Sequence, residues 1–247
     1  MWAPDKDTKV VMVTGFPDQN TSKMPSREFI YQLPPDTRAT NGEYIEIFPM
    51  DKPLQESATT KHREWLAITA DQVKQWSPDL VVHVRLDVNN GAGVFKLGRA
   101  APKEGCHNIP DVDRKAFTRA GYKNVFTKPA AFLNTNLDID SVFEIWQTAC
   151  SSLTSSVAME SSMKNGTLEF KYKWAVDVKL SDEPTSYTCG YQYYISMLQA
   201  EKTTGKKDHV FVSVPKCEIK EEVRLSTQVI EELIKAVVDV QGKTEDH

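Results

Sequence analysis

Cys189 is the residue of this sequence best placed for nucleophilic chemistry. It follows a run of β-type residues that ends at Ser181, and the pattern after it predicts a helix. The positive end of a helix dipole and the unpaired N–H groups of a first turn favour a thiolate, the reactive form of cysteine. Free cysteine is also among the most buried residue types, and composition alone favours a small packing residue. The sequence therefore leaves two interpretations of Cys189 open.

The elements that must position Cys189 alternate between strand and helix. We expect strands at residues 9–16, 43–50, 80–86, 174–181 and 209–215, and helices near 25–33, 58–76, 138–152, from Cys189 onward and after a cap at Ser226. This alternation predicts an α/β fold, a three-layer α/β/α sandwich around a mostly parallel, mixed sheet. Ligands of such sheets bind beyond the carboxyl ends of strands, where we expect segment 85–96 to meet Cys189.

Composition excludes several classes of function. The formal net charge is -4, from 30 basic and 34 acidic residues spread along the chain, so we expect no nucleic-acid partner. No apolar stretch approaches the ~20 residues that span a bilayer, and we expect no signal peptide in the first residues. The 4 cysteines are far apart and include no CxxC pair, so neither disulfides nor a zinc site is indicated. We therefore expect a cytoplasmic protein without a membrane partner.

Several segments occur together in the order and spacing of one enzyme family. They are VVMVTGF with PSREFI, SPDLVVHV, IPD at 109–111, VDVKLSDEPTSYTCGYQYY and VFVSVP. In these segments the chain resembles the pyroglutamyl peptidase I family of cysteine peptidases, from about residue 9 to 240, most strongly around Cys189. The resemblance implies an α/β/α protein that removes N-terminal pyroglutamate from peptides without metal or cofactor. Against that family, we expect one domain over 1–247 with insertions near 34–43 and 156–172.

The residues that would carry the family's chemistry are largely replaced. The family uses a cysteine nucleophile, a histidine that takes and returns the proton, and a glutamate. The resemblance places Cys189 on the nucleophile, but Ser213 stands at the histidine position and Lys96 at the glutamate position. A serine hydroxyl does not accept a proton at neutral pH. The catalytic set is therefore expected to be degenerate.

The pocket for the pyroglutamate ring also departs from the family pattern. Phe16 is kept, but Gln19 stands where a second phenylalanine ring is usual, and Asn108 stands where an arginine usually precedes IPD. Tyr187 falls on a family position. We expect these four residues to line the pocket, which has lost one apolar wall.

No other histidine is an evident substitute base. His209 lies on the strand of Ser213, but four residues at ~3.3 Å each place it about 13 Å away, and we expect it to be exposed. His83 lies within the apolar run LVVHVRL and is interpreted as a core histidine. His62 and His107 are assigned to a polar helix face and a loop.

Three functions remain open for this sequence. The first is a protein that has lost peptidase activity and acts as a structural or binding subunit, in a homo-oligomer or a larger assembly such as a cytoskeletal or organellar one. The alternative is an active, diverged pyroglutamyl peptidase or related cysteine hydrolase, whose partner would be a pyroglutamyl peptide. The third is a thiol sensor in which Lys96 stabilises the thiolate of Cys189.

Overall fold

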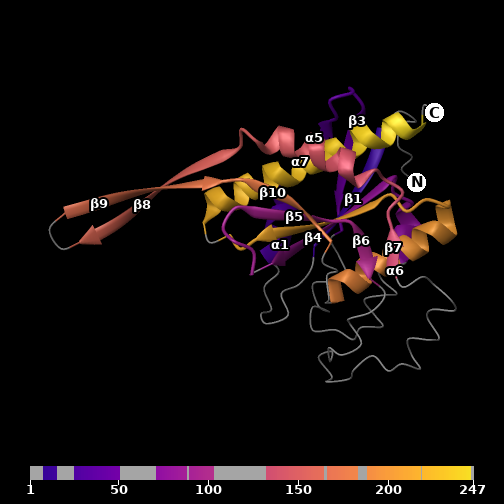
Figure 1. Ribbon diagram of the computed structural model, residues 1–247, viewed down its shortest axis with the longest axis horizontal. Coiled ribbons are helices and arrows are strands. Elements are labelled where there is room, and N and C mark those ends of the chain that lie inside the picture. The colour runs from indigo at the N-terminus through magenta and orange to yellow at the C-terminus, as the bar shows by residue number, and fades with distance from the viewer. Residues whose placement is uncertain are drawn as a thin grey trace, which may run out of the picture.

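A mixed sheet runs through the centre of the protein, and helices cover both of its faces (Figure 1). The structure is a computed structural model, and it describes residues 8–15, 25–50, 71–87, 89–102, 132–163, 166–182, 188–217 and 219–245. Among these residues, no helix is both long enough and apolar enough to cross a membrane.

The sheet contains seven strands in the order β10-β5-β11-β4-β1-β3-β2. Their bounds are β1 (Thr8–Gly15), β2 (Asp36–Arg38), β3 (Tyr44–Pro49), β4 (Leu80–Asp87), β5 (Val94–Gly98), β10 (Asp177–Ser181) and β11 (His209–Pro215). Strands β11, β4, β1 and β3 are mutually parallel, whereas β5 and β10 run parallel to each other and antiparallel to β11. The predicted α/β fold with a mostly parallel, mixed sheet is confirmed.

One face of the sheet is covered by α1 (Pro25–Gln32), α5 (Ile139–Cys150) and α7 (Lys220–Glu245), which share a large apolar core with it. Within that core, Nε1 of Trp146 donates a hydrogen bond to the carbonyl of Val229 at 2.9 Å. The opposite face carries α6 (Thr188–Thr204), with Cys189 in its first turn. A helical segment at 71–76 adds Val73 beside α6. Figure 1 shows α5 and α7 on one side of the sheet and α6 on the other.

Local sequence explains where two of these helices begin. Asp138 caps α5, since its carboxylate accepts the backbone N–H of Ser141 at 3.2 Å. The predicted cap of α7 at Ser226 is wrong, because that helix begins at Lys220 and Ser226 is buried inside it. Glu222 accepts the backbone N–H of Ile219 at 3.4 Å, so a carboxylate one turn earlier starts the helix.

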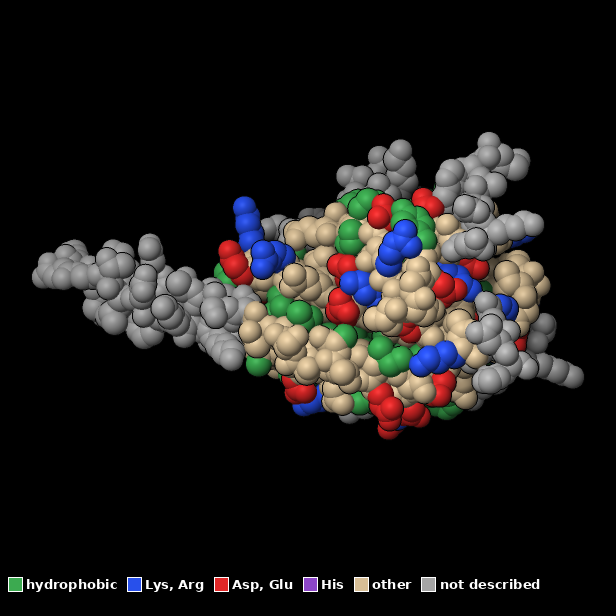
Figure 2. All heavy atoms as spheres, turned by 90° about the horizontal axis from the view of Figure 1, so that it is seen from above, with side chains coloured by type: hydrophobic (Ala, Val, Ile, Leu, Met, Phe, Trp, Pro, Cys, Tyr) green, Lys and Arg blue, Asp and Glu red, His purple; other side chains and the backbone are tan. Residues whose placement is uncertain are grey.

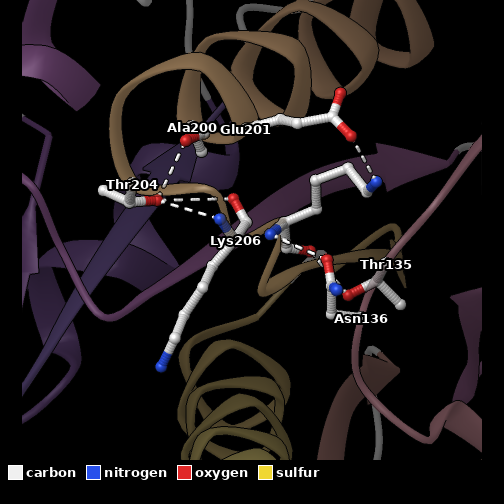
Figure 3. Close-up of polar contacts among 7 residues, drawn as sticks. Thr135, Asn136, Ala200, Glu201, Thr204 and Lys206 are labelled. Carbon is white, nitrogen blue, oxygen red and sulfur yellow. Dashed lines mark hydrogen bonds and ion pairs between the residues drawn. The ribbon is translucent and has the colours of Figure 1, made fainter.

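The turn after α6 fixes the helix against β11 (Figure 3). The hydroxyl of Thr204 donates to the carbonyl of Ala200 at 2.9 Å, and Gly205 follows in a left-handed conformation with φ of 73°. The backbone N–H of Lys207 donates to Asn136 at 2.9 Å, and its ammonium donates to Glu201 at 2.7 Å. These contacts hold the start of β11 to the last turn of α6.

Segment 85–96 and Cys189 were expected to meet beyond a common carboxyl edge of the sheet. That geometry is wrong, because β5 and β10 run opposite to β4 and therefore end at the other edge. Strand pairing instead aligns one residue from each of five neighbouring strands in a row across the middle of the sheet. The row consists of Thr14, His83, Phe211, Gly98 and Ser181. The segments that carry the candidate residues therefore meet on the face of the sheet, beneath α6.

Two further strand pairs lie outside the central sheet. β6 (Ala100–Pro102) pairs with β7 (Phe132–Asn134), and β8 (Thr154–Met163) pairs with β9 (Gly166–Ala175). The β8–β9 hairpin projects far from the body, at the left of Figure 1. It spans residues 156–172, where one insertion is predicted, and residues 34–43, where the other is predicted, hold β2 and a turn at Gly42 with φ of 94°. The single-domain assignment stays a prediction.

Candidate functional site

Cys189 lies in the first turn of α6 and is only 7% exposed. It packs in an apolar cluster with Tyr193, Phe211 and Leu133, among others. Burial raises the pKa of its thiol to about 11, although the positive charge of Arg85 acts in the opposite direction. A thiol in this environment holds its proton at neutral pH, and a nearby arginine does not offset its burial.

The direction of α6 can be read from the sheet residues that its successive turns contact. Near its end, Ala200 packs with Val81 at the start of β4. In its middle, Ser196 is hydrogen-bonded to Nε2 of His83 at 2.7 Å. At its beginning, Cys189 is in the same cluster as Phe211, which pairs with His83. The helix therefore runs opposite to β4 and β11, and its first turn faces the next row of the sheet.

That next row contains two of the three predicted catalytic positions. Ser213 pairs with Lys96 of β5 on one side and with Arg85 of β4 on the other. Residues paired across neighbouring strands point to the same face, as do residues two apart along a strand. Because Phe211 contacts α6, Ser213 lies on the α6 face, and so do Lys96 and Arg85. The structure thus brings Lys96 and Ser213 together in front of the helix that carries Cys189.

Arg85 is the first residue of the segment that was expected to meet Cys189, although it was assigned no catalytic or pocket role. It lies two residues after His83, which is buried under α6, so strand alternation puts both on one face. That spacing was the available signal, but its use required knowing that α6 covers the face. The residues expected to line a pocket, Phe16, Gln19, Asn108 and Tyr187, lie outside the described residues.

Two histidines are buried between the sheet and the middle of α6. His83 is fully buried, as predicted, with Nδ1 hydrogen-bonded to the hydroxyl of Thr14 at 2.7 Å. The expectation that His209 is exposed is wrong, because it is 3% exposed and Nδ1 lies 3.0 Å from the hydroxyl of Ser196. Strand β11 is central in the sheet, so even its first residue lies beneath the helix.

The hydrogen bonds around Ser196 define the tautomers of both rings. Its hydroxyl donates to the carbonyl of Tyr193 at 2.9 Å, so it can only accept from Nε2–H of His83 and Nδ1–H of His209. Burial lowers the pKa of His83 well below its usual value and that of His209 to about 3. Both rings are therefore neutral and committed to a network that joins α6 to the sheet.

The described part of the chain contains no cluster of three or more histidine, cysteine or acidic residues that could hold a metal. Charged side chains of both signs are interspersed on the face shown in Figure 2, with no single-sign patch among the coloured residues. His62 and His107 lie outside the described residues. The chemistry of the described site is thus set by a protonated thiol, a hydroxyl and two basic side chains.

The fold and the position of Cys189 define an α/β/α sandwich with a thiol at the start of a helix on the sheet. Solved structures of pyrrolidone carboxyl peptidases have the same architecture. A mutant of the Pyrococcus furiosus enzyme matches with a TM-score of 0.62 and 15% identity, over 93% of this chain and 98% of that one. The Thermococcus litoralis enzyme matches with a TM-score of 0.61 and 15% identity, over 96% of both chains.

A further Pyrococcus furiosus structure, described together with its Cys-free mutant, matches with a TM-score of 0.62 and 15% identity, over 93% of this chain and 98% of that one. No family model and no curated protein matches the sequence. The chain therefore has a pyroglutamyl peptidase I-like fold, as the sequence resemblance predicts. At this identity the likeness establishes the fold and leaves the chemistry to the residues.

Proposed function

We propose that this chain is a pyroglutamyl peptidase-like protein that has lost peptidase activity and acts as a binding or structural subunit. The observation that carries the proposal is the composition of the row in front of Cys189. It offers Ser213 and Lys96, while the imidazoles of His83 and His209 are bonded to Ser196 beneath the middle of α6. A cysteine peptidase needs a base that takes the thiol proton and returns it to the leaving amine.

The state of the thiol supports the same conclusion. With a pKa of about 11, roughly one Cys189 side chain in 10⁴ is a thiolate at pH 7. A serine hydroxyl and a lysine ammonium do not accept a proton at that pH. General-base assistance contributes about 10²–10⁴-fold, and members of a catalytic triad fail together when one is removed.

The direct test is hydrolysis of a pyroglutamyl aminomethylcoumarin substrate by the recombinant full-length chain. We expect no release above that of the Cys189→Ala variant, with a pyrrolidone carboxyl peptidase as the positive control. The double variant Ser213→His, Lys96→Glu tests whether only the base and carboxylate are missing. Hydrolysis by the parent that Cys189→Ala abolishes would contradict the proposal and favour an active, diverged peptidase.

The proposal extends to the setting of the protein. A binding or structural subunit needs a partner, either a second copy of this chain or another protein in a larger assembly. The projecting β8–β9 hairpin supplies a surface outside the sandwich for such a contact (Figure 1). A cytoplasmic location suits the cysteines among the described residues, Cys150, Cys189 and Cys217, which are all free thiols.

A further inference from the structure

The register of the β8–β9 hairpin divides its residues between two faces of different character. Successive pairs along an antiparallel ladder belong to opposite faces, so every second pair shares a face. One set of alternate pairs carries the large apolar residues, and we call it the aromatic face. It consists of Ser155 with Trp174, Val157 with Tyr172, Met159 with Phe170, Ser161 with Leu168, and Met163 with Gly166.

The pairs between these form a polar face. They are Thr154 with Ala175, Ser156 with Lys173, Ala158 with Lys171, Glu160 with Glu169, and Ser162 with Thr167. All charged residues of the two strands are therefore on one face, and all of their aromatic residues are on the other. Alternation with the period of a strand is typical of a ribbon that has one face buried.

The hairpin has little within its own chain to bury that face against. β8 and β9 form a separate 2-stranded sheet, and although β8 contacts α7, most of the ladder lies beyond the sandwich (Figure 1). A two-stranded hairpin alone is marginally stable in water, and Glu160 directly opposite Glu169 weakens this one further. Contiguous apolar surface of this kind marks an interaction site. The hairpin therefore needs a partner that covers its aromatic face.

Residue sizes along the aromatic face make it complementary to a second copy of itself. Trp174 lies in the half next to the sandwich, and Gly166 lies at the tip. A two-fold axis between two such faces, perpendicular to the strands at the Met159–Phe170 pair, lays the tip of one hairpin over the base of the other. Trp174 of each copy then faces Gly166 of the other, and Phe170 faces Phe170. Large residues opposite small ones allow two stacked sheets to interdigitate.

The area of the aromatic face is that of a stable protein interface. Aromatic side chains bury about 150–250 Å² each, so Trp174, Tyr172 and Phe170 account for ~450–750 Å² on each copy. Leu168 and the methionines of the same face add to this. A standard interface buries about 800 Å² per partner. Two hairpins stacked by their aromatic faces therefore suffice to hold two chains together.

We propose that the aromatic face of the β8–β9 hairpin binds the same face of a second copy of this chain, in a two-fold dimer with the hairpins tip over base. Two-fold dimers with the same patch on both subunits are the commonest oligomers of soluble proteins. The polar face, with Lys171 and Lys173, stays in water on both copies. The inference rests on the proposed role as a structural subunit, for which it names the partner.

The test is sedimentation equilibrium of the full-length chain over a range of concentrations. We expect the parent to sediment with twice the chain mass of 27.9 kDa. Phe170→Thr should raise the dissociation constant by about 100-fold or more, because it removes an aromatic anchor from both copies. Threonine suits a strand, so the ladder is kept. Lys171→Thr is the matched control at the next position, on the polar face, and it should change the constant by less than about threefold.

A parent that is monomeric at all concentrations would overturn the inference, as would equal weakening by Phe170→Thr and Lys171→Thr. Tyr172→Thr repeats the test at a second position of the aromatic face and should also weaken the dimer. Melting temperatures show whether the sandwich of each variant is folded.

Flotation with vesicles of phosphatidylcholine and phosphatidylserine tests a different occupant of the aromatic face. A monomeric parent that binds these vesicles, and loses that binding in Phe170→Thr, would assign the face to a membrane and overturn the dimer. Self-association is measured without substrate, so the two proposals fail separately. Hydrolysis that Cys189→Ala abolishes refutes the loss of peptidase activity, whereas a monomeric parent refutes the pairing of hairpins.

Discussion

Cys189 combines a position that favours a thiolate with an environment that opposes it. The first turn of α6 and the charge of Arg85 favour the ionised form, but the side chain is packed among Tyr193, Phe211 and Leu133. The free energy lost when a thiolate is removed from water is larger than the electrostatic stabilisation from one nearby cation, unless the two groups are in direct contact. The thiol-sensor hypothesis therefore finds no support in the described surroundings of this residue.

This balance predicts slow alkylation of Cys189. Its rate with iodoacetamide should stay low through pH 7–9 and rise towards a midpoint near 11, because the thiolate is the nucleophile. Mass spectrometry of the peptide that contains Cys189 separates it from the other cysteines. Arg85→Met should shift the midpoint higher still. A midpoint near 8.5, the value of free cysteine, would mean that the thiol is far more accessible than its packing indicates.

The sequence predicted the burial of His83, but it predicted neither the burial of His209 nor the pairing of Ser213 with Lys96. An apolar run on both sides of His83 predicted burial correctly. His209 was assigned to the surface as the first residue of its strand, because the sequence does not reveal that α6 folds back over that end of β11. The pairing of Ser213 with Lys96 required the register of two strands that are far apart in the chain.

At the scale of elements, α6 is attached to the sheet by a polar network within an apolar contact. His83 and His209 both reach Ser196, and the hydroxyl of Tyr193 donates to the carbonyl of His209 at 3.1 Å. Both imidazoles have lowered pKa values in the folded protein, so the unfolded chain binds more protons than the folded one below about pH 6.5. Their contribution to stability is full above that pH and is lost as the pH falls towards the folded values.

The expected size is roughly 2 kcal/mol per histidine at pH 5, relative to pH 7. Urea unfolding at both pH values measures it. His209→Asn keeps a side-chain donor near Ser196 but does not titrate, so its loss of stability between pH 7 and pH 5 should be smaller than the parent's by about that amount. An unchanged pH dependence in this variant would show that His209 is already protonated, or solvated, in the folded state.

The reversed direction of β5 has a physical cause that is visible in the sequence. Residues 88–93 alone separate β4 from β5, whereas a parallel crossover needs a dozen residues or more. Strand β5 must therefore return in the opposite direction, and β10 follows it as a parallel neighbour. Residues 94–98 were not predicted to form a separate strand, because VFKLG is short and lies among loop residues. Without that strand, the reversal was missed and a common carboxyl edge was expected.

At the scale of the whole molecule, the chain divides into a sandwich with a continuous core and a hairpin that stands outside it. The core on the α5 and α7 side draws residues from the sheet strands and from three helices, which is why alternating apolar patterns sufficed to predict the fold class. The β8–β9 hairpin pairs with itself over its full length, from Thr154 with Ala175 to Met163 with Gly166. The sequence predicted an insertion near residues 156–172, but the length of the hairpin as a regular ladder could not be predicted from its composition.

This division predicts that the hairpin can be shortened without loss of the fold. Replacement of residues 157–172 by Asn-Gly leaves Ser156 and Lys173 as the last pair before a two-residue turn. Since the sandwich core is untouched, the melting temperature should change by less than about 4 °C, which corresponds to under ~1–2 kcal/mol for a chain of this size. Differential scanning calorimetry measures that change.

Light scattering on the same variant tests what the hairpin does. If the hairpin mediates assembly, the parent should scatter as an oligomer or acquire mass with its partner, and the shortened chain should remain a monomer of normal stability. A fall in melting temperature of more than about 10 °C would contradict the division, because it would make the hairpin part of the folding core. An oligomer that survives the shortening at full stability would place the subunit contact on the sandwich, and the hairpin would then have no role in holding copies of the chain together.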